Sequence, residues 1–164
     1  MGCLGVHFAV EGEVMERLLA ATNDVDRSAI IEEIEEGGEY DEWSYDTDKA
    51  WDGLHRCLTD GNLHWDGGDY PLKLTILGGE RLFEGEDYII CLTKPDEVKD
   101  VSMALRDLDQ EELKRRYQMI PAAEYDVELG EDDFGYLWEN FEGLRGFYQR
   151  ASQAGRAVVF TADQ

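Results

Sequence analysis

The segment DKAWDGLHRCLTDG, residues 48–61, brings together side chains that could carry out acid–base chemistry. His55 follows Asp52 by three positions, and residues three or four apart are neighbours on a helix surface. A histidine held by a carboxylate can serve as a general base near neutral pH. Two roles are therefore open for the pair. His55 could be catalytic with Asp52 orienting it, or it could fix the helix through a hydrogen bond at the border of the core.

Other catalytic and metal-binding patterns are missing from the sequence. The three histidines and three cysteines show neither HExxH nor CxxC spacing, so we expect no metal site and no cofactor. No GxSxG motif marks a nucleophilic serine. Gly78-Gly79 lacks the later Gly and Lys of a phosphate-binding loop and is interpreted as a turn. Three widely spaced cysteines indicate thiols in a cytoplasmic protein.

A binding surface beside the same segment is the second candidate. Residues 40–70 hold six of the 18 Trp, Tyr and Phe side chains, several of them in polar loops. Loop aromatics next to carboxylates are typical of binding hot spots, although such rings also fold back to cover a core. The predicted contact residues are Trp43, Tyr45, Asp48, Lys49, Trp51 and Trp65.

Net charge restricts the class of partner. The chain has 38 Asp and Glu against 15 Lys and Arg, a formal charge of −23. Residues 24–52 contain twelve of these acids and residues 124–142 contain eight. Because nucleic acids and anionic membranes repel such a chain, neither is expected as a partner. A basic protein or a cationic small molecule fits better, and solvated acidic faces with no partner are the alternative.

The elements that position these residues follow from hydrophobic periodicity. Within 48–60 the apolar side chains fall in one arc of a helix, which Thr47 or Asp48 can cap. Further helices are expected at 12–21, from Asn23 or Asp24 to Gly37, from Pro95 to Leu108, from Asp109 to Pro121 and over 132–154. Strands are expected at 2–9, 71–77, 87–93 and 156–162, and a loop at 39–48.

This order of elements predicts an α+β fold. We expect a single domain over 1–164, in which about six helices pack on a small mixed sheet of about four short strands. The first and last strands are expected to be neighbours. Gly135, Gly143 and Gly146 lie inside the 132–154 helix and each costs about 1 kcal/mol relative to alanine. Close packing by another element would compensate for that cost.

Residues 48–61 also carry a resemblance to a known family. DKAWDGLHRCLTDG followed by YPLKLTILGG resembles the hallmark of the YfbM-like family, small bacterial proteins that form a domain-of-unknown-function family. The amino-terminal start and the run DYIICLTKPDEVKDVSMALRDLDQEELKRRY are similar as well, so the resemblance covers nearly the whole chain. It implies a single cytoplasmic α+β domain and transfers no activity, cofactor or catalytic residue.

Two function hypotheses follow from the sequence. The first is a non-enzymatic binding or regulatory module, in which carboxylates attract a cationic partner and aromatic rings supply the desolvated contact. The second is a small enzyme with His55 as general base. The enzyme hypothesis requires the His55 imidazole to be exposed in a concave pocket.

Overall fold

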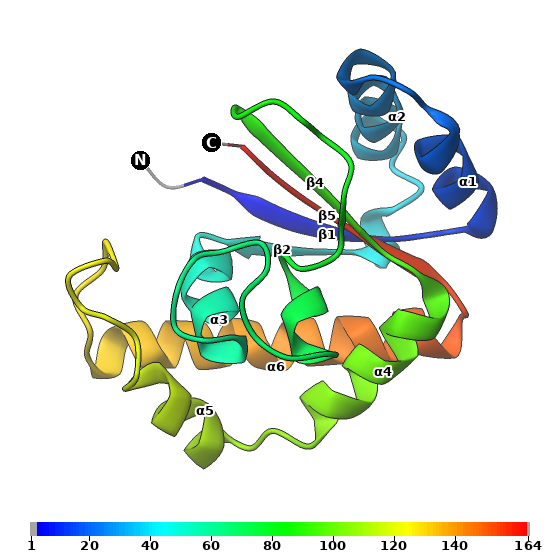
Figure 1. The fold of residues 1–164 in the computed structure, drawn as a ribbon. Coiled ribbons are helices and arrows are strands. Elements are labelled where there is room, and N and C mark those ends of the chain that lie inside the picture. The colour runs from blue at the N-terminus through cyan, green and yellow to red at the C-terminus, as the bar shows by residue number, and fades with distance from the viewer. Residues whose placement is uncertain (1–2, 164) are drawn as a thin grey trace.

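The computed structural model describes residues 3–163 as one five-stranded sheet with helices on both faces (Figure 1). The helices in this range are α1 Gly12–Ala20, α2 Asp24–Glu36, α3 Ala50–Leu58, α4 Pro95–Arg106, α5 Gln110–Tyr117 and α6 Glu131–Gln153. The strands are β1 Gly5–Val10, β2 Ser44–Asp48, β3 Glu80–Arg81, β4 Tyr88–Thr93 and β5 Ala157–Asp163. Two short 3-10 helices are η1 Asp41–Trp43 and η2 Leu72–Thr75. The predicted α+β class and all six helices are confirmed.

The sheet has the order β2-β1-β5-β4-β3, and every neighbouring pair is antiparallel. The expectation of a mixed sheet was therefore wrong, because no pair is parallel. The sheet has five strands in the described residues, one more than expected. The first and last strands are neighbours as predicted, with Gly5 opposite Ala162 and Val10 opposite Ala157. The strand expected at 2–9 includes Gly2, which lies outside the described residues.

Strand β5 shows how one stretch of sequence serves two cores. Successive side chains of a strand point to opposite faces of the sheet. Val158 and Phe160 accordingly pack in the core beneath α3, α4, α5 and α6, whereas Ala157 and Val159 pack in the smaller core beneath α1 and α2. A central strand that is covered on both faces reads as a continuous apolar run, which is the pattern of AVVF in this sequence.

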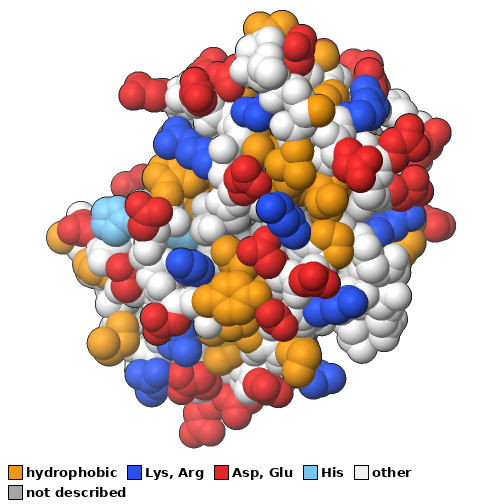
Figure 2. All heavy atoms as spheres, turned by 45° about the vertical axis from the view of Figure 1, so that its right-hand side comes forward, with side chains coloured by type: hydrophobic (Ala, Val, Ile, Leu, Met, Phe, Trp, Pro, Cys, Tyr) orange, Lys and Arg blue, Asp and Glu red, His pale blue; other side chains and the backbone are white. Residues whose placement is uncertain are grey.

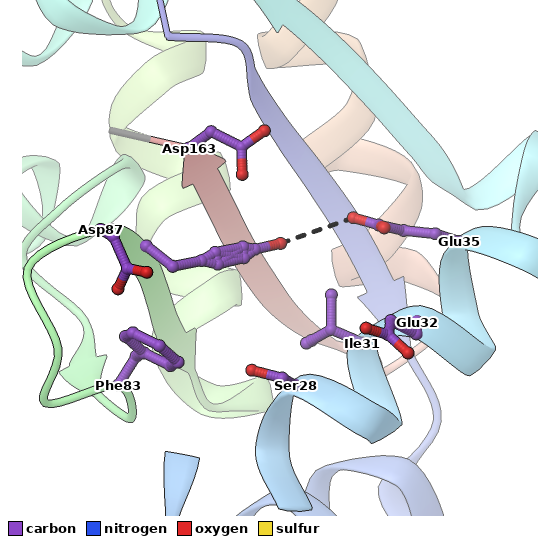
Figure 3. A pocket seen from close by; sticks show the side chains of 8 residues that line it. Ser28, Ile31, Glu32, Glu35, Phe83, Asp87 and Asp163 are labelled. Carbon is purple, nitrogen blue, oxygen red and sulfur yellow. Dashed lines mark hydrogen bonds between the residues drawn. The ribbon is translucent and has the colours of Figure 1, made fainter. Parts of the chain in front are cut away.

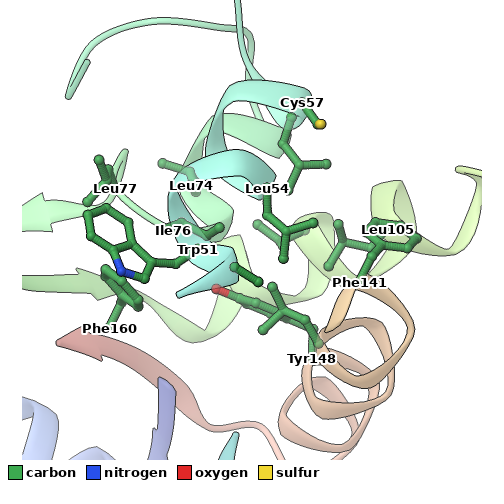
Figure 4. Close-up of a cluster of buried hydrophobic side chains, with 14 of the residues drawn as sticks. Trp51, Leu54, Cys57, Leu74, Ile76, Leu77, Leu105, Phe141, Tyr148 and Phe160 are labelled. Carbon is green, nitrogen blue, oxygen red and sulfur yellow. The ribbon is translucent and has the colours of Figure 1, made fainter. Parts of the chain in front are cut away.

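The larger core forms around α3 and α6 (Figure 4). All residues of α3 except Asp52 are buried. Trp51 lies against Phe160 with ring centroids 5.6 Å apart, and its indole nitrogen donates to the Cys3 carbonyl at 2.8 Å. An indole buried among apolar side chains needs such a partner for its N–H. The 48–61 segment is thus held to the sheet by its aromatic residue.

The expected strand at 71–77 is the clearest error in the predicted secondary structure. These residues form η2 and a following turn, and Leu74, Ile76 and Leu77 are buried. A short apolar run has the same pattern in a buried strand and in a buried helical segment. Here the Thr75 carbonyl accepts from His7 Nε2 at 2.9 Å and from Tyr148 Oη at 2.7 Å. Side chains therefore satisfy a backbone group that a strand would have paired with its neighbour.

Strand β2 was expected to be a loop because acids dominate it. Its burial nevertheless alternates, since Thr47 is buried between the exposed Asp46 and Asp48. The expected capping of α3 by Thr47 or Asp48 was also wrong. Thr47 Oγ1 donates to the Gly5 carbonyl, and the Asp48 carboxylate accepts from Tyr136 Oη at 2.7 Å. Both side chains tie β2 to its neighbours and leave the start of α3 without a side-chain cap.

Helix α6 tests the expectation about its three glycines. A methyl group at Gly143 would overlap the ring of Tyr45, so close packing is confirmed there. Gly135 has open space where a Cβ would lie, and the nearest atom to a Cβ at Gly146 is the end of the Arg150 side chain. Close packing therefore explains one glycine of the three. Within residues 3–163 there is no helix of the length and apolarity that crossing a membrane requires.

Candidate functional site

The side chains of the predicted pair, His55 and Asp52, bond to different partners in the structure. His55 is 1% exposed, and its Nε2 bonds to the His64 carbonyl at 2.8 Å. Asp52 instead accepts from Arg56 Nε at 2.7 Å. Burial lowers the pKa of His55, which keeps the ring neutral at pH 7. Because the imidazole is buried and Asp52 bonds to Arg56, the arrangement expected of an exposed general base oriented by Asp52 is absent.

The predicted tryptophans do not form one surface. Trp51 is in the core, as described above. The guanidinium of Arg156 stacks on Trp43 at 3.9 Å, and that of Arg81 stacks on Trp65 at 4.2 Å. Both rings also pack on the larger core. The alternative in which loop aromatics cover the core therefore describes Trp43 and Trp65 better than a shared binding surface does.

Tyr45, Asp48 and Lys49 do come together, along β2 and beside α6. Tyr45 Oη donates to Asn140 Oδ1 at 3.3 Å, and Tyr136 Oη donates to Asp48 as noted above. The Lys49 backbone N–H donates to the same Tyr136 hydroxyl at 3.2 Å. These three predicted residues lie at the free edge of the sheet.

A pocket between α2 and the ends of β4 and β5 is the best candidate for a ligand site (Figure 3). Its volume is about 340 Å³. It is lined by Ser28, Ile31, Glu32, Glu35, Phe83, Asp87, Tyr88 and Asp163. The sequence prediction included none of these residues.

Helix periodicity and strand register bring these residues together. The four lining residues of α2 have the spacing i, i+3, i+4 and i+7, which places them on one side of a helix. Tyr88 and Asp163 are directly opposite each other on β4 and β5, so their side chains share a face. Phe83 meets Tyr88 edge to face, with ring centroids 5.6 Å apart.

Two side chains of α2 fix the helix against the loop that precedes β4. The Asp24 carboxylate accepts from the backbone N–H groups of Glu84 and Gly85 at 2.9 and 3.0 Å. Arg27 Nη1 donates to the Leu82 carbonyl at 2.7 Å. These bonds hold α2 against the β4 side of the pocket.

All the charged residues that line the pocket are acidic. Glu32, Glu35, Asp87 and Asp163 line it, and no Lys or Arg does. Throughout residues 3–163, none of the ion pairs within 4 Å involves these four carboxylates. Burial and then the negative charge of Asp163 raise the pKa of Glu35, whose Oε1 also accepts from Tyr88 Oη at 3.5 Å. Burial raises the pKa of Tyr88 to about 12, so it stays a neutral donor.

The chemistry available to this pocket is recognition of positive charge. Carboxylates attract a cation, and the faces of Phe83 and Tyr88 offer the aromatic surface on which cationic groups stack. Over the described range 3–163, no three His, Cys, Asp or Glu side chains converge in a way that could hold a metal ion. Burial raises the pKa of the Cys57 and Cys91 thiols to about 12, which makes both poor nucleophiles.

The pocket escaped sequence analysis because its members are far apart in the chain. They come from residues 28–35, 83–88 and 163. One signal was available, since Ser28, Glu32 and Glu35 share a helical stripe with the apolar Ile31. A stripe of this kind shows that polar groups border the core, and it does not show which strand ends lie opposite.

Comparisons with known proteins give a family and a fold. A family model described as a domain of unknown function (DUF1877) matches residues 1–161. Protein YfbM of Escherichia coli (strain K12) is 26% identical over an alignment of 171 positions, which covers 97% of each chain. The crystal structure of YfbM, titled a protein of unknown function, matches with a TM-score of 0.71 at 22% identity. That match covers 97% of this chain and 99% of the other.

Proposed function

From the premise that this chain belongs to the DUF1877 family, whose description carries no activity, we propose a function on the geometry of the pocket. The protein is a binding module that recognises a cationic group in the pocket between α2 and the ends of β4 and β5. The ligand is a basic side chain of a partner protein or a small organic amine. The expectation of a cytoplasmic location belongs to the same proposal.

The observation that carries the proposal is the set of four carboxylates around two aromatic rings without a cation among the lining residues. Burial, and after it the negative charge of Asp163, raises the pKa of Glu35. A bound cation relieves this repulsion and gains contact with the rings. The overall charge of −23 adds a long-range attraction for positively charged partners.

Titration of the protein with N-acetyl-lysine amide, N-acetyl-arginine amide and putrescine at low salt tests the proposal. In two-dimensional NMR spectra we expect the largest shifts at Glu35, Phe83 and Tyr88, with affinity that weakens as salt is added. Glu35→Gln removes one charge and should weaken binding about three- to tenfold. Affinity should also fall as the pH is lowered through the raised pKa of Glu35, because the protonated carboxyl no longer attracts a cation.

The matched control is Glu16→Gln, which removes one exposed charge from α1 and is not a lining residue. Its affinity should equal that of the parent protein. Equal weakening in both variants, or shifts spread evenly over all acidic surfaces, would mean that the chain attracts cations without a specific site.

A further inference from the structure

The outer side of β2 is an open edge of the sheet. In the strand order, β2 has β1 as its one hydrogen-bonded neighbour, so the backbone groups on its other side have no strand partner in the described chain. The opposite edge is β3, which has two residues, Glu80 and Arg81. An open edge is a template for a further strand, because extended segments recognise its free N–H and C=O groups. The five residues of β2 span about 17 Å, enough for a segment of similar length.

Acidic and tyrosine side chains flank this edge. Asp46 and Asp48 are exposed on either side of the buried Thr47, where the pairing of β2 with β1 is irregular. Glu139 on α6 is exposed as well. Tyr45 Oη donates to Asn140, the residue that follows Glu139 on α6, and burial and then the charges of Glu139 and Asp46 raise the pKa of the Tyr45 hydroxyl. In the described range, none of these three acids forms an ion pair within 4 Å.

The charges decide which strand can be added. A second copy of this chain would place its own Asp46 and Asp48 close to the same acids, and like charges that face one another across strands are destabilising. The acids therefore protect the edge against self-association, as charged residues on edge strands do. The same charges favour an incoming segment whose alternate residues are lysine or arginine.

We infer that the free edge of β2 is a docking site for an extended, lysine- or arginine-bearing segment of a partner protein, which pairs with β2 as an added antiparallel or parallel strand. Backbone hydrogen bonds give the segment its extended conformation, and its cationic side chains meet Asp46, Asp48 and Glu139. The inference shares with the proposed function the positive charge of the partner, but it concerns a different surface. The pocket lies at α2, β4 and β5, and the edge lies at β2 and α6.

A peptide of six residues that alternates lysine with valine, with acetylated and amidated ends, is the probe. Two N-methylated forms of this peptide keep every charge, and each removes the N–H donors of one set of alternate residues. A strand added at an edge uses one set of its N–H groups and leaves the other toward water. We therefore expect one N-methylated form to bind about tenfold or more weakly and the other to keep the parent affinity within about twofold.

Three variants show where on the protein the peptide binds. Glu139→Gln should weaken the peptide about three- to tenfold, whereas Glu16→Gln should not change its affinity. Glu35→Gln removes a charge from the pocket, and the difference between the two N-methylated forms should persist in this variant, because a pocket that holds a lysine side chain does not read the peptide N–H groups.

Equal binding of both N-methylated forms would overturn strand addition, because recognition would then depend on charge alone. Weakening by Glu35→Gln without weakening by Glu139→Gln would overturn the edge as the site and place the peptide in the pocket. The same measurements also show whether the proposed function of the pocket fails while the inference about the β2 edge holds. If lysine and arginine derivatives do not bind at the pocket while the peptide shows the expected asymmetry, the inference stands and the proposed function of the pocket fails.

Discussion

At the scale of single residues, His7 is the side chain whose charge state matters most for folding. It lies on β1 with no exposed surface and is packed by the rings of Phe147, Tyr148 and Phe160. Its Nε2 bonds to the Thr75 carbonyl, which only accepts, so this nitrogen carries the proton. Nδ1 is buried and has no hydrogen-bond partner within the described residues. Burial lowers the pKa of His7 to about 4, and the bond to Thr75 offsets part of that effect.

This lowered pKa predicts an acid-labile component of stability. In the unfolded chain His7 takes up a proton near its ordinary pKa of 6.5, whereas in the folded chain it does so near 4. The stabilisation is therefore complete above pH 6.5 and is lost as the pH falls toward 4. The difference of 2.5 pKa units (6.5 − 4) corresponds to about 3 kcal/mol. Urea unfolding of the parent and of His7→Phe between pH 7 and 4 measures it.

The comparison with His7→Phe separates this effect from the titration of the carboxylates, which both proteins share. Between pH 7 and 4, the free energy of unfolding should fall by about 3 kcal/mol less in His7→Phe than in the parent protein. Should the variant fail to fold, the ring proton resonances of His7 in the parent provide a second measurement. They should stay unchanged from pH 8 to 5, and a titration centred near pH 6.5 in the folded protein would contradict the prediction.

At the scale of elements, we expect opposite changes in stability from two glycine-to-alanine substitutions in α6. Gly135→Ala places a methyl group in open space and should stabilise the protein by about 0.5–1 kcal/mol, the difference in helix propensity. Gly143→Ala drives the methyl group into the ring of Tyr45 and should destabilise by about 1–3 kcal/mol. Thermal and urea unfolding of the two variants measures both signs. Stabilisation by both substitutions would show that β2 moves freely away from α6.

The elements also show what sequence reasoning can and cannot supply. The six helices were predictable because each has an apolar stripe, and Asn23 and Asp109 accept from backbone N–H groups at the starts of α2 and α5. β2 escaped prediction although Tyr45 and Thr47 alternate with acids. Such alternation is weak evidence over five residues, and it does not say that Gly5 and Phe8 lie opposite Asp48 and Ser44.

The candidate sites also differ in how much of each could be predicted from the sequence. The prediction of a helix within residues 48–61 is confirmed, but the composition of the segment alone could not separate packing from chemistry. The partners that settle the positions of Trp51 and His55 are the carbonyls of Cys3 and His64, which composition and periodicity do not reveal. The pocket required knowledge that β5 ends opposite the start of β4, which is a property of the strand order. A strand order that joins the first and last strands depends on contacts distant in sequence.

At the scale of the whole molecule, excess negative charge opposes folding as well as attracting cations. Figure 2 shows one face, on which acidic side chains surround scattered hydrophobic side chains and lysine or arginine groups. With a net charge of −23, like charges are closer together in the folded state than in the unfolded chain. Screening by salt reduces this repulsion over the Debye length, which shortens from about 30 Å at 0.01 M to about 8 Å at 0.15 M.

Salt should therefore stabilise this protein at neutral pH, in contrast to a protein held together by exposed ion pairs. Exposed pairs such as Arg17 with Glu33 and Arg115 with Glu112 each contribute at most about 1 kcal/mol. We expect Tm at pH 7 to rise between 0.01 and 0.15 M sodium chloride. A gain of about 1 kcal/mol corresponds to about 2–4 °C for a chain of this size. Chloride is the appropriate anion because sulfate also strengthens hydrophobic burial. A Tm that falls over this range would mean that local ion pairs outweigh the net charge, and the long-range attraction proposed for cationic partners would lose its basis.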